Sequence, residues 1–303
     1  MAKFHTPDMD KAAKNRGSRR RGSELASPGK QAWYRFRRNK SAIVGMCIVI
    51  FVVLCAILAG VLAPYHYAQQ DYTAMKQAPS ALHWFGTDPL GRDILSRCLY
   101  GARTSLLISV VCVITSICTG GLVGTISGYL GGRVDNLIMR ICDVFQAIPT
   151  ILLAMSITTV LGTGIMPLII AITISCFAGA CRNFRTAILS VKTGEFVSAS
   201  KAINVGTFRM ILKHLVPNAI GMICLYIVSM LAIGIIVVCS LSYIGAGIGE
   251  PIPDWGGILN RGKTYLLTHP YMTLFPTGCI ALTVFGFNLL GNGLRDALDP
   301  RLN

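Results

Sequence analysis

The segment SAIVGMCIVIFVVLCAILAGVLA runs from Ser41 to Ala63 and contains no charged side chain. A helix needs about 20 consecutive apolar residues to cross the hydrocarbon core of a bilayer. In the whole chain of 303 residues, 53% are hydrophobic and 14% are charged, whereas soluble domains carry roughly 25% charged residues. The mean hydropathy of +0.58 agrees. These values exclude a disordered chain, a secreted disulfide scaffold and a purely soluble enzyme.

Further apolar runs of similar length follow, and together they predict an all-α polytopic membrane protein with six transmembrane helices. The six predicted spans are Ser41–Ala63, Thr104–Leu130, Asn136–Leu161, Ile165–Ala180, Ala219–Ile244 and Tyr271–Asn292. No signal-peptide cleavage pattern precedes the first span, so we expect a retained anchor. The chain then divides into a tail (1–40), a first helix with its outer loop (41–103), and a five-helix core (104–303) with a cytoplasmic loop at 182–217.

Basic residues are distributed unevenly about these spans. If the N-terminal tail lies inside the cell, the inner segments hold 21 Lys and Arg residues and the outer loops hold six. The positive-inside rule then places both termini in the cytoplasm. The tail (1–40) has 12 basic and three acidic residues. We expect it to be disordered and attracted to anionic lipid. Nucleic acid is not an expected partner, because no base-reading or stacking surface follows.

The 11 cysteines give no sign of a metal or redox site. No CxxC pair occurs, and all but Cys98 lie in or beside apolar runs, so zinc and thioredoxin-like sites have no support. We expect these thiols to act as small buried hydrophobic groups. No His, Cys and Met cluster has metal-ligand spacing along one span, so no metal site is predicted.

A phosphate-loop pattern, G-x-x-x-x-G-K-[ST], occurs at Gly257–Thr264. Such a loop cradles phosphate only between a β-strand and a helix N-terminus. Here Pro251 and Pro253 precede the pattern, which is unfavourable for a strand, and Pro270 follows closely. The charge distribution also places this loop outside the cytoplasm. We therefore expect no nucleotide or other cofactor in this chain.

Two features lie inside the predicted spans. The first is a series of glycines at intervals of four, Gly120, Gly124, Gly128 and Gly132. Glycines at this spacing share one helix face and allow another helix to approach closely. We favour simple helix packing there over a face that slides when a transporter changes state, and the sequence does not separate the two.

The second feature is Arg140 and Asp143, which are three residues apart in the third span and can pair. A structural pair near the cytoplasmic interface is favoured over a proton or ion relay, because Arg140 can reach the interface. Pro149 should kink this helix. No span carries the series of acidic or His residues typical of a proton-coupled carrier, although a gradient-driven secondary carrier stays open as an alternative class.

The long loop before the fifth span is basic and partly apolar. Glu195–Ile203 predicts a short amphipathic helix with Phe196, Ala199 and Ala202/Ile203 on one side. Asn204-Val205-Gly206 predicts a turn, because Asn and Gly tolerate left-handed backbone. Thr207 is expected to cap a second helix that ends near His214, and Pro217 marks the start of the fifth span.

Two short helices in such a loop need a partner to bury their apolar face, or they lie on the membrane surface.

The stretch FVSASKAINVGTFRMILKHLVPN, Phe196–Asn218, resembles the EAA loop of permease subunits of bacterial ABC importers. Other segments are similar to the C-type permease of the peptide and nickel importer subfamily. They are FGTDPLGRDILSR (85–97), YGARTSL (100–106), GYLGGRVD (128–135), DVFQAIP (143–149), LSYIG (241–245), WGG (255–257) and GNGLRDALDPRL (291–302). The resemblance covers nearly all of the chain from Ala32 onward.

The loop departs from the family pattern at two places. Ser198-Ala199-Ser200 stands where the family has Glu-Ala-Ala, and Asn204 stands where the family usually has Gly. Asn can adopt the left-handed conformation at modest cost, so the turn should persist. Glu195 precedes Ser198 by one helical turn and can share its face. The expected coupling residues are Glu195, Phe196, Ser198, Ala199, Ser200, Ala202, Ile203, Asn204, Gly206, Leu212 and Pro217.

The resemblance implies an ABC type I importer permease fold in a bacterial cytoplasmic membrane. It implies that the loop docks onto a cytoplasmic ATPase, and that ATP-driven closure of two ATPase subunits moves the spans between inward-facing and outward-facing states. A second, homologous permease and an extracytoplasmic binding protein complete the expected complex. The chain itself would have no catalytic residue, and ATP and Mg²⁺ would be bound by the ATPase subunits.

The substrate is less well defined by the sequence. Di- or oligopeptides are the first expectation, because peptide systems dominate the similar subfamily, with nickel, glutathione and opine-like compounds as alternatives. The outer loops at 64–103 and 245–270 suit contact with a binding protein, and interfacial anchoring by Trp84 and Trp255 is an equal alternative. A membrane enzyme would need a nucleophile and base in reach, and the five His residues are isolated in sequence.

Overall fold

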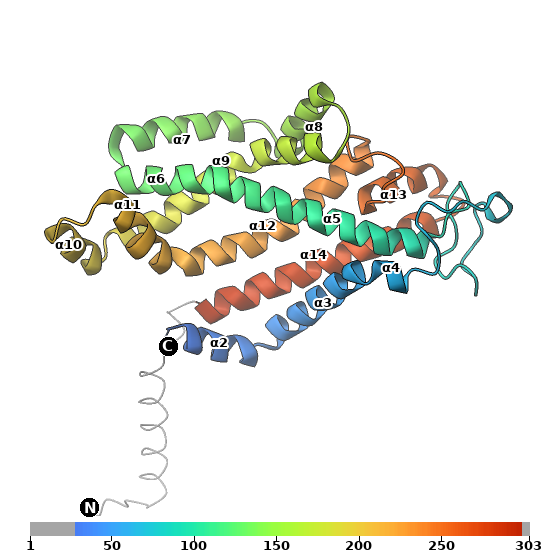
Figure 1. The fold of residues 1–303 in the computed structure, drawn as a ribbon, viewed down its shortest axis with the longest axis horizontal. Helices are drawn as coiled ribbons and strands as arrows, with labels where there is room; N and C mark the ends of the chain where they lie inside the picture. Colours follow the sequence, from blue (N-terminus) through green and yellow to red (C-terminus); the bar gives the residue numbers. More distant parts are fainter. Residues whose placement is uncertain (1–27, 299–303) are drawn as a thin grey trace, which may run out of the picture.

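The computed structural model describes residues 28–298. Within these residues the chain forms helices joined by loops, and no strand occurs beyond one isolated bridge between Thr87 and Asp93. The helices lie along the long axis of an elongated bundle (Figure 1). They are α2 (Pro28–Arg38), α3 (Lys40–Ile57), α4 (Ala59–Leu62), η1 (Tyr72–Ala74), α5 (Ile94–Ser116), η2 (Ile117–Gly121), α6 (Leu122–Leu130), α7 (Gly132–Gln146), α8 (Thr150–Leu161), α9 (Ile165–Lys192), α10 (Glu195–Ala202), α11 (Thr207–Arg209), η3 (Met210–Leu215), α12 (Val216–Ile244), α13 (Trp255–Gly262), η4 (Lys263–Tyr265) and α14 (Tyr271–Leu298).

Among the described residues, five helices are long and apolar enough to cross a membrane, or up to six if the bent pair α7 and α8 forms one span. Several of them are longer than the apolar runs predict. The helix through α5, η2 and α6 begins at Ile94, well before the predicted Thr104, because Asp93 caps it: the Asp93 carboxylate accepts a hydrogen bond from the backbone N–H of Ser96 at 2.7 Å.

The third predicted span is not one continuous helix. α7 and α8 meet at an angle of 81°, and the break falls at Pro149, where the sequence predicts a kink. Pro149 has an extended backbone and precedes the first residue of α8, since proline lacks the N–H that would continue the helical ladder. The prediction of a kink is correct, and the predicted span at Asn136–Leu161 consists of two helices, α7 and α8, that can form one bent span.

The N-terminal region also differs from the prediction. The part of the expected disordered tail at 1–27 lies outside the described residues, but Pro28–Arg38 forms the helix α2. Phe36 of α2 is buried with Ala42 of α3 and Ala297 of α14. Asn39 caps α3 and donates a hydrogen bond from Nδ2 to the carboxylate of Asp296 at 3.0 Å. The start of α3 is therefore fixed to the end of α14.

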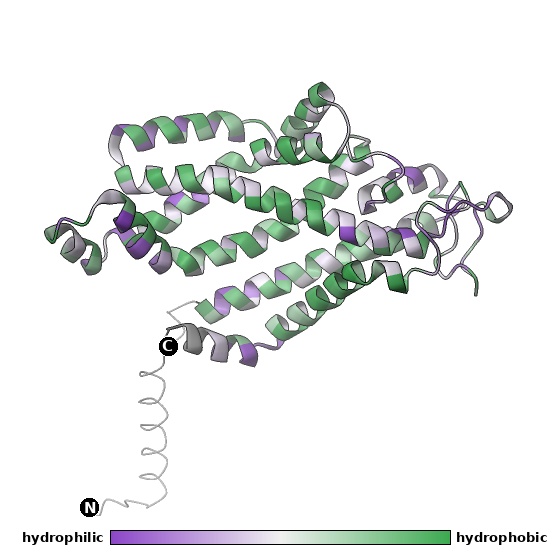
Figure 2. Cartoon of the chain, viewed as in Figure 1, coloured by the Kyte–Doolittle hydropathy of each residue, from purple (hydrophilic) through white to green (hydrophobic). Residues whose placement is uncertain are grey.

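Side-chain polarity changes along the bundle. Hydrophobic residues predominate along the middle of the bundle, and hydrophilic residues are more frequent toward its two ends (Figure 2). Large apolar side chains such as Phe51 and Val61 are exposed on α3 and α4. In a soluble protein, exposed apolar surface of this extent marks an interaction site. In a bundle with several spanning helices it is the surface that faces lipid.

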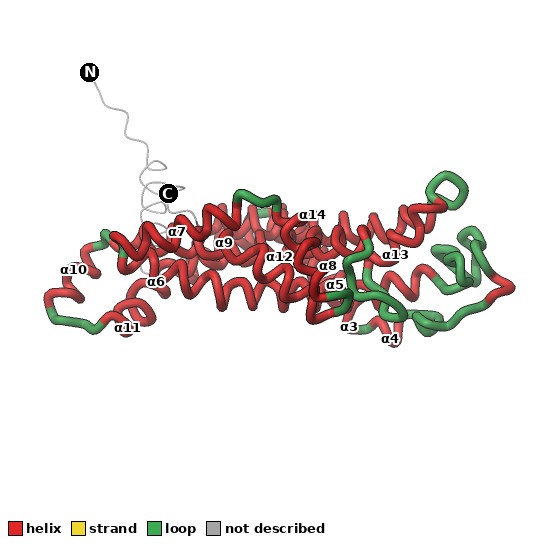
Figure 3. The backbone as a smooth tube through the Cα atoms, turned by 90° about the horizontal axis from the view of Figure 1, so that it is seen from above, coloured by secondary structure: helices red, strands yellow, loops and turns green. Residues whose placement is uncertain are grey.

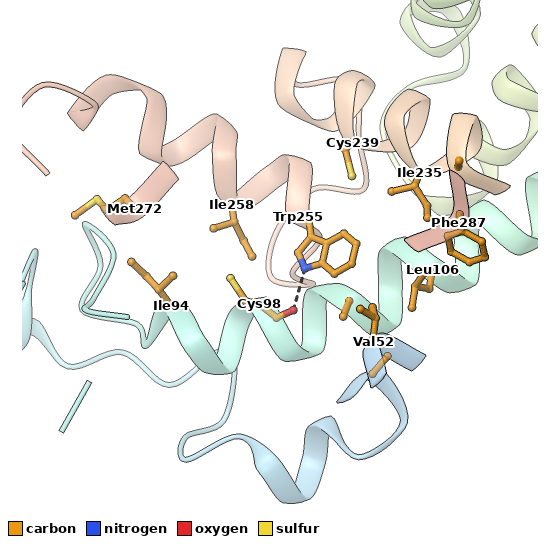
Figure 4. Close-up of a cluster of buried hydrophobic side chains, with 13 residues drawn as sticks. Val52, Ile94, Cys98, Leu106, Ile235, Cys239, Trp255, Ile258, Met272 and Phe287 are labelled. Atoms are coloured by element: carbon orange, nitrogen blue, oxygen red, sulfur yellow. Dashed lines mark hydrogen bonds between the residues drawn. The ribbon is translucent and has the colours of Figure 1, made fainter. Parts of the chain in front are cut away.

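The best-defined part of the core surrounds Trp255 of α13. Its indole is 1% exposed, and its Nε1–H donates to the carbonyl oxygen of Cys98 in α5 at 3.0 Å (Figure 4). Ile94 of α5, Ile258 of α13 and Phe287 of α14 belong to the same cluster. Because buried tryptophan needs a partner for its N–H, this bond holds α13 in one position on α5.

All 11 cysteines are free thiols. Six are buried, namely Cys98, Cys112, Cys142, Cys176, Cys181 and Cys239. Cys47 and Cys118 are exposed, so the expectation of buried thiols is wrong for these two. Cys98, which the sequence places in a polar stretch, is buried against Trp255 because α5 begins earlier than its apolar run.

Candidate functional site

α10 and α11 extend beyond the helical bundle at one end, and the loop at 63–93 and α13 lie at the other (Figures 1 and 3). We call these the α10 end and the opposite end. α10 is attached to the bundle through its inner face. Val197 is buried in a cluster with Ile188 of α9 and Met210 of η3. Ser200 is buried as well, and its hydroxyl donates to the carbonyl oxygen of Phe196 at 2.8 Å.

The outer face of α10 is exposed and partly apolar. Ser198, Ala199 and Ala202 are exposed there, and Ile203 follows with 77% of its surface accessible. Phe208 is 76% exposed just beyond the turn. The predicted face is corrected at one position: Phe196 packs partly buried against the inner cluster instead of lying beside Ala199.

The turn after α10 depends on one residue in the left-handed conformation. Asn204 has φ of +53°, whereas Gly206 has φ of −61°. The backbone N–H of Val205 donates to the carbonyl oxygen of Ser200 at 3.1 Å and closes the turn. Asn204 therefore occupies the conformation for which the family pattern has Gly, as the sequence predicts, at the small cost that Asn has in this region.

The second short helix of the loop is not separate from the fifth span. α11, η3 and α12 form one continuous helix, Thr207–Ile244, and Gly206 rather than Thr207 is its N-cap. η3 has π-helical hydrogen bonding. Pro217 lacks an N–H and its ring crowds the carbonyl four residues earlier, at Lys213. The wider π turn at Met210–Leu215 accommodates this without breaking the helix.

Other predicted coupling residues lie on the exposed side of this region. Glu195 is exposed in the first turn of α10, where an acidic group is favoured by the helix dipole. It is three residues before Ser198, so the two share a face. Leu212 is half exposed in η3, and Pro217 is exposed at the start of α12.

Three of the four glycines in the predicted series lie against α9. A Cβ atom at Gly120 would be 2.3 Å from the carbonyl oxygen of Phe177, and one at Gly124 would be 2.0 Å from that of Cys181. Gly128 lies against Arg185 in the same way, at 3.0 Å. The prediction that Gly132 lies on the same helix face is wrong. α6 ends at Leu130, and Gly132 starts α7 with open space around it.

The charged residues of the third predicted span do not pair with each other. The carboxylate of Asp143 accepts a hydrogen bond from Arg182 of α9 at 2.5 Å, so the predicted pair with Arg140 is wrong. Asp135 pairs with Arg185 at 2.5 Å and also accepts from the hydroxyl of Ser127 at 2.5 Å. These pairs join residues 39 and 50 positions apart, which local spacing in the sequence does not reveal.

The opposite end holds a second charged site that the sequence analysis did not identify. We call Arg92, Arg97 and Arg261 the arginine cluster. The carboxylate of Glu250 pairs with all three, at 2.5 Å for Arg92 Nη1 and 3.3 Å for Arg97 Nη2. Asp88 accepts a hydrogen bond from Arg92 Nε at 2.7 Å. These ion pairs therefore join the segment at 88–97 to the segment at 250–261.

A cavity of about 250 Å³ adjoins the arginine cluster. Arg97, Glu250, Arg261 and Asp254 contribute to its lining. Burial raises the pKa of Asp254, and hydrogen bonding to the backbone of Gly257 opposes the increase. Burial and the neighbouring Arg92 lower the pKa of Arg261. The charges around this cavity are thus in a poorly solvated setting.

The phosphate-loop pattern at Gly257–Thr264 lies in α13 and η4. Its N-terminal helix position is already occupied, because the Asp254 carboxylate accepts from the backbone N–H of Gly257 at 3.1 Å. Gly256 lies against the carbonyl oxygen of Cys239 in α12. This geometry packs α13 onto α12 and is unlike a phosphate cradle.

The described residues form a bundle of long apolar helices with an exposed helical loop at one end. Its fold is similar to that of a chain in the inward-facing MetNI methionine ABC transporter. The TM-score is 0.57 at 19% sequence identity, and the match covers 68% of this chain and 98% of the other. The chain therefore has the type I ABC importer permease fold.

The family of binding-protein-dependent transport system inner membrane components matches residues 120–303, and the N-terminal TM domain of oligopeptide transport permease C matches residues 27–79. This chain belongs to that family of inner membrane components and is a permease subunit of an ABC importer.

Curated relatives extend the match over most of the chain. The oligopeptide transport system permease protein OppC of Bacillus subtilis is 40% identical over 97% of both chains. The dipeptide transport system permease protein DppC of the same organism is 39% identical, over 89% of this chain and 85% of that one. The glutathione transport system permease protein GsiD of Escherichia coli O6:K15:H31 is 39% identical over 92% of both.

Proposed function

We propose that this chain moves di- or oligopeptides across the bacterial cytoplasmic membrane as the permease subunit of an ATP-driven importer. The identity of about 40% to peptide permeases over nearly the whole chain supports this substrate class. Glutathione, itself a peptide, is the nearest alternative because of the similarity to GsiD. Nickel is a further alternative from the subfamily, although no group of three potential metal-ligating residues occurs among residues 28–298.

The orientation and partners belong to the same proposal. We place the α10 end and both termini in the cytoplasm, in line with 21 basic residues on that side against six on the other. A homologous second permease, two ATPase subunits that bind ATP and Mg²⁺, and an extracytoplasmic binding protein complete the complex. This chain supplies no catalytic residue.

The single observation that carries the coupling role is the exposed outer face of α10. Ala199 and Ile203 are directed away from the bundle, while Val197 fixes the inner face to α9 and η3. An ATPase that binds the outer face would bury apolar surface that is otherwise in water. A shift of α10 would then reach α9 and the continuous helix Thr207–Ile244 at the same time.

The continuous helix Thr207–Ile244 would transmit movement from the α10 end to the opposite end. The far part of α12 contacts α13 closely, where Gly256 lies against Cys239. A groove of about 860 Å³ is lined by residues of α12, α13 and α14, among them Tyr243 and Thr277. We assign this groove to the translocation path. Tilting of α12 would change its width and give alternating access.

The experiment is a double substitution, Ala199→Glu with Ile203→Glu, in the complete complex. Charged side chains on the outer face should abolish binding of the ATPase subunits and peptide uptake, while insertion into the membrane is unchanged. Leu267→Glu is the matched control, because Leu267 is 97% exposed at the opposite end. Co-purification of the ATPase subunits and uptake of a radiolabelled dipeptide are measured for both.

A gradient-driven carrier, the alternative class, would continue to transport with the double substitution. Continued uptake with intact insertion would therefore contradict the proposal. Competition of the labelled dipeptide by longer peptides, glutathione and Ni²⁺ then separates the substrate alternatives.

A further inference from the structure

Glu250 is the meeting point of three guanidinium groups. Its carboxylate pairs with Arg92, Arg97 and Arg261. The side chains of Arg92 and Arg97 are only 2% exposed, whereas that of Glu250 is 40% exposed. The cations are therefore fixed in the protein interior, and the anion that satisfies them reaches in from the surface.

The three arginines of the cluster form ion pairs with two carboxylates, and the buried Asp254 carboxylate lies near Arg97 in the same cavity. Asp88 and Glu250 are the two carboxylates that contact it, against three arginines. Asp93 pairs with His83 at 3.0 Å instead. A buried guanidinium cannot lose its proton, and an unpaired one is strongly destabilising. The cluster therefore needs a carboxylate at the position that Glu250 occupies.

Glu250 lies on the non-helical segment that connects two helices. It lies between the end of α12 at Ile244 and the start of α13 at Trp255. Gly245 and Gly249 of this segment have positive φ, at +104° and +84°. The Glu250 carboxylate holds the segment to the arginine cluster, and the carbonyl oxygen of Gly247 accepts a hydrogen bond from the backbone N–H of Gly164 at 3.1 Å.

The cavity beside Glu250 is large enough for one residue of a peptide and too small for a whole oligopeptide. Its volume is about 250 Å³, whereas pockets for whole drug-sized ligands measure roughly 300–1,000 Å³. Arg97 and Arg261 line it beside the polar side chains of Ser242 and Asn260. Asp254 lines it too, but is engaged in capping α13. The cavity can hold a carboxylate with the one residue that carries it.

We propose that this cavity is a carboxylate-binding subsite in which the C-terminal carboxylate of a substrate peptide replaces Glu250 on Arg97 and Arg261. The inference rests on the proposed peptide function. The exchange leaves no buried arginine unpaired, because one carboxylate leaves as another arrives. It also frees the Glu250 side chain from the arginine cluster, so occupancy by substrate changes the ion pairs at the opposite end.

The test uses the complete complex in lipid nanodiscs without its binding protein, and the probe is radiolabelled Ala-Ala measured by equilibrium dialysis. Glu250→Gln removes the internal competitor and should tighten Ala-Ala binding at least tenfold. Ala-Ala with an amidated C-terminus should show no such gain. Asp71→Asn is the matched control, because Asp71 is an exposed carboxylate of the same end that contacts Thr73 rather than an arginine.

A second variant locates the binding and guards against a folding defect. Adding Arg261→Gln to Glu250→Gln should reverse the gain at least tenfold, since one of the two proposed ligands is lost. Equal binding of the acid and the amide, or a gain that survives Arg261→Gln, would overturn the subsite. Wild-type complex that takes up no peptide would overturn the proposed function itself, which is a different result.

Discussion

Midway along the bundle, on α7 and α9, the pair of Asp143 and Arg182 has side chains that are 54% and 43% exposed, whereas Arg92 and Arg97 at the opposite end are 2% exposed. The α10 end has large exposed apolar side chains, because Ile203 and Phe208 are 77% and 76% accessible. The opposite end is closed by its own ion pairs. One end therefore exposes apolar side chains to solvent, while the other buries charged side chains that are satisfied by ion pairs.

The largest expected effect is at the opposite end. Asp88→Asn removes a carboxylate that is 7% exposed and contacts Arg92 and Arg97. Breaking a buried ion pair from one side costs about 3–5 kcal/mol. The free energy of unfolding in mixed detergent and SDS micelles should fall by this amount. A loss below about 1 kcal/mol would mean that water reaches these arginines and that the two ends do not differ.

Next in size is the contact of α6 with α9. Gly124→Ala places a methyl group where a Cβ would be 2.0 Å from the carbonyl oxygen of Cys181, so the helices must separate at a cost of about 1–3 kcal/mol.

Gly278→Ala in α14 is the matched control, because a Cβ there meets nothing within 4 Å. It should raise the free energy of unfolding by about 0.5–1 kcal/mol through the better helix propensity of Ala. The same unfolding measurement compares both variants. If Gly124→Ala and Gly278→Ala change the free energy of unfolding in the same direction, the close contact of α6 with α9 is refuted.

A smaller effect is expected from Asp143→Asn on α7, midway along the bundle. The pair with Arg182 is half exposed, and exposed ion pairs contribute about 0–1 kcal/mol. The free energy of unfolding should therefore change by no more than this, in contrast to Asp88→Asn. If Asp143→Asn lowers the free energy of unfolding as much as Asp88→Asn does, the exposure of an ion pair does not determine its contribution to stability.

The smallest effect concerns the turn after α10. Asn204→Gly removes the side chain from a residue with φ of +53°, which relieves a conformational cost of about 1 kcal/mol at most and adds some backbone entropy in the unfolded chain. Uptake and ATPase binding should stay at wild-type levels. A strong loss of either would show that the Asn204 side chain itself contacts the ATPase.

Local signals in the sequence predicted local structure well. The apolar pattern of Glu195–Ile203 gave α10 almost to its bounds, Asn204 forms the predicted turn, and Pro149 breaks the third span. Each of these depends on residues within a few positions of one another. The helix ends were misjudged because polar residues such as Arg185 extend α9 beyond its apolar run by pairing with another helix.

The two ion-pair sites show why the rest was not predictable. Asp143 has a basic residue three positions away in sequence, yet its partner is Arg182, which tertiary packing brings to it. In the arginine cluster, Arg92 and Arg97 pair with Glu250, which is 158 and 153 residues away in sequence. Hydropathy and charge counts placed these residues in outer loops with balanced charge, but a single sequence carries no information on which of them meet.

The continuous helix Thr207–Ile244 has a consequence that follows from its length. Its 38 residues extend roughly 57 Å at 1.5 Å per residue, while the hydrocarbon core of a bilayer is about 30 Å thick. Nearly half of the length of this helix therefore extends beyond the hydrocarbon core of the bilayer. A small tilt of such a rod moves its tip by several ångströms, and the π-helical turn at its base, η3, is the weakest place along it to bend.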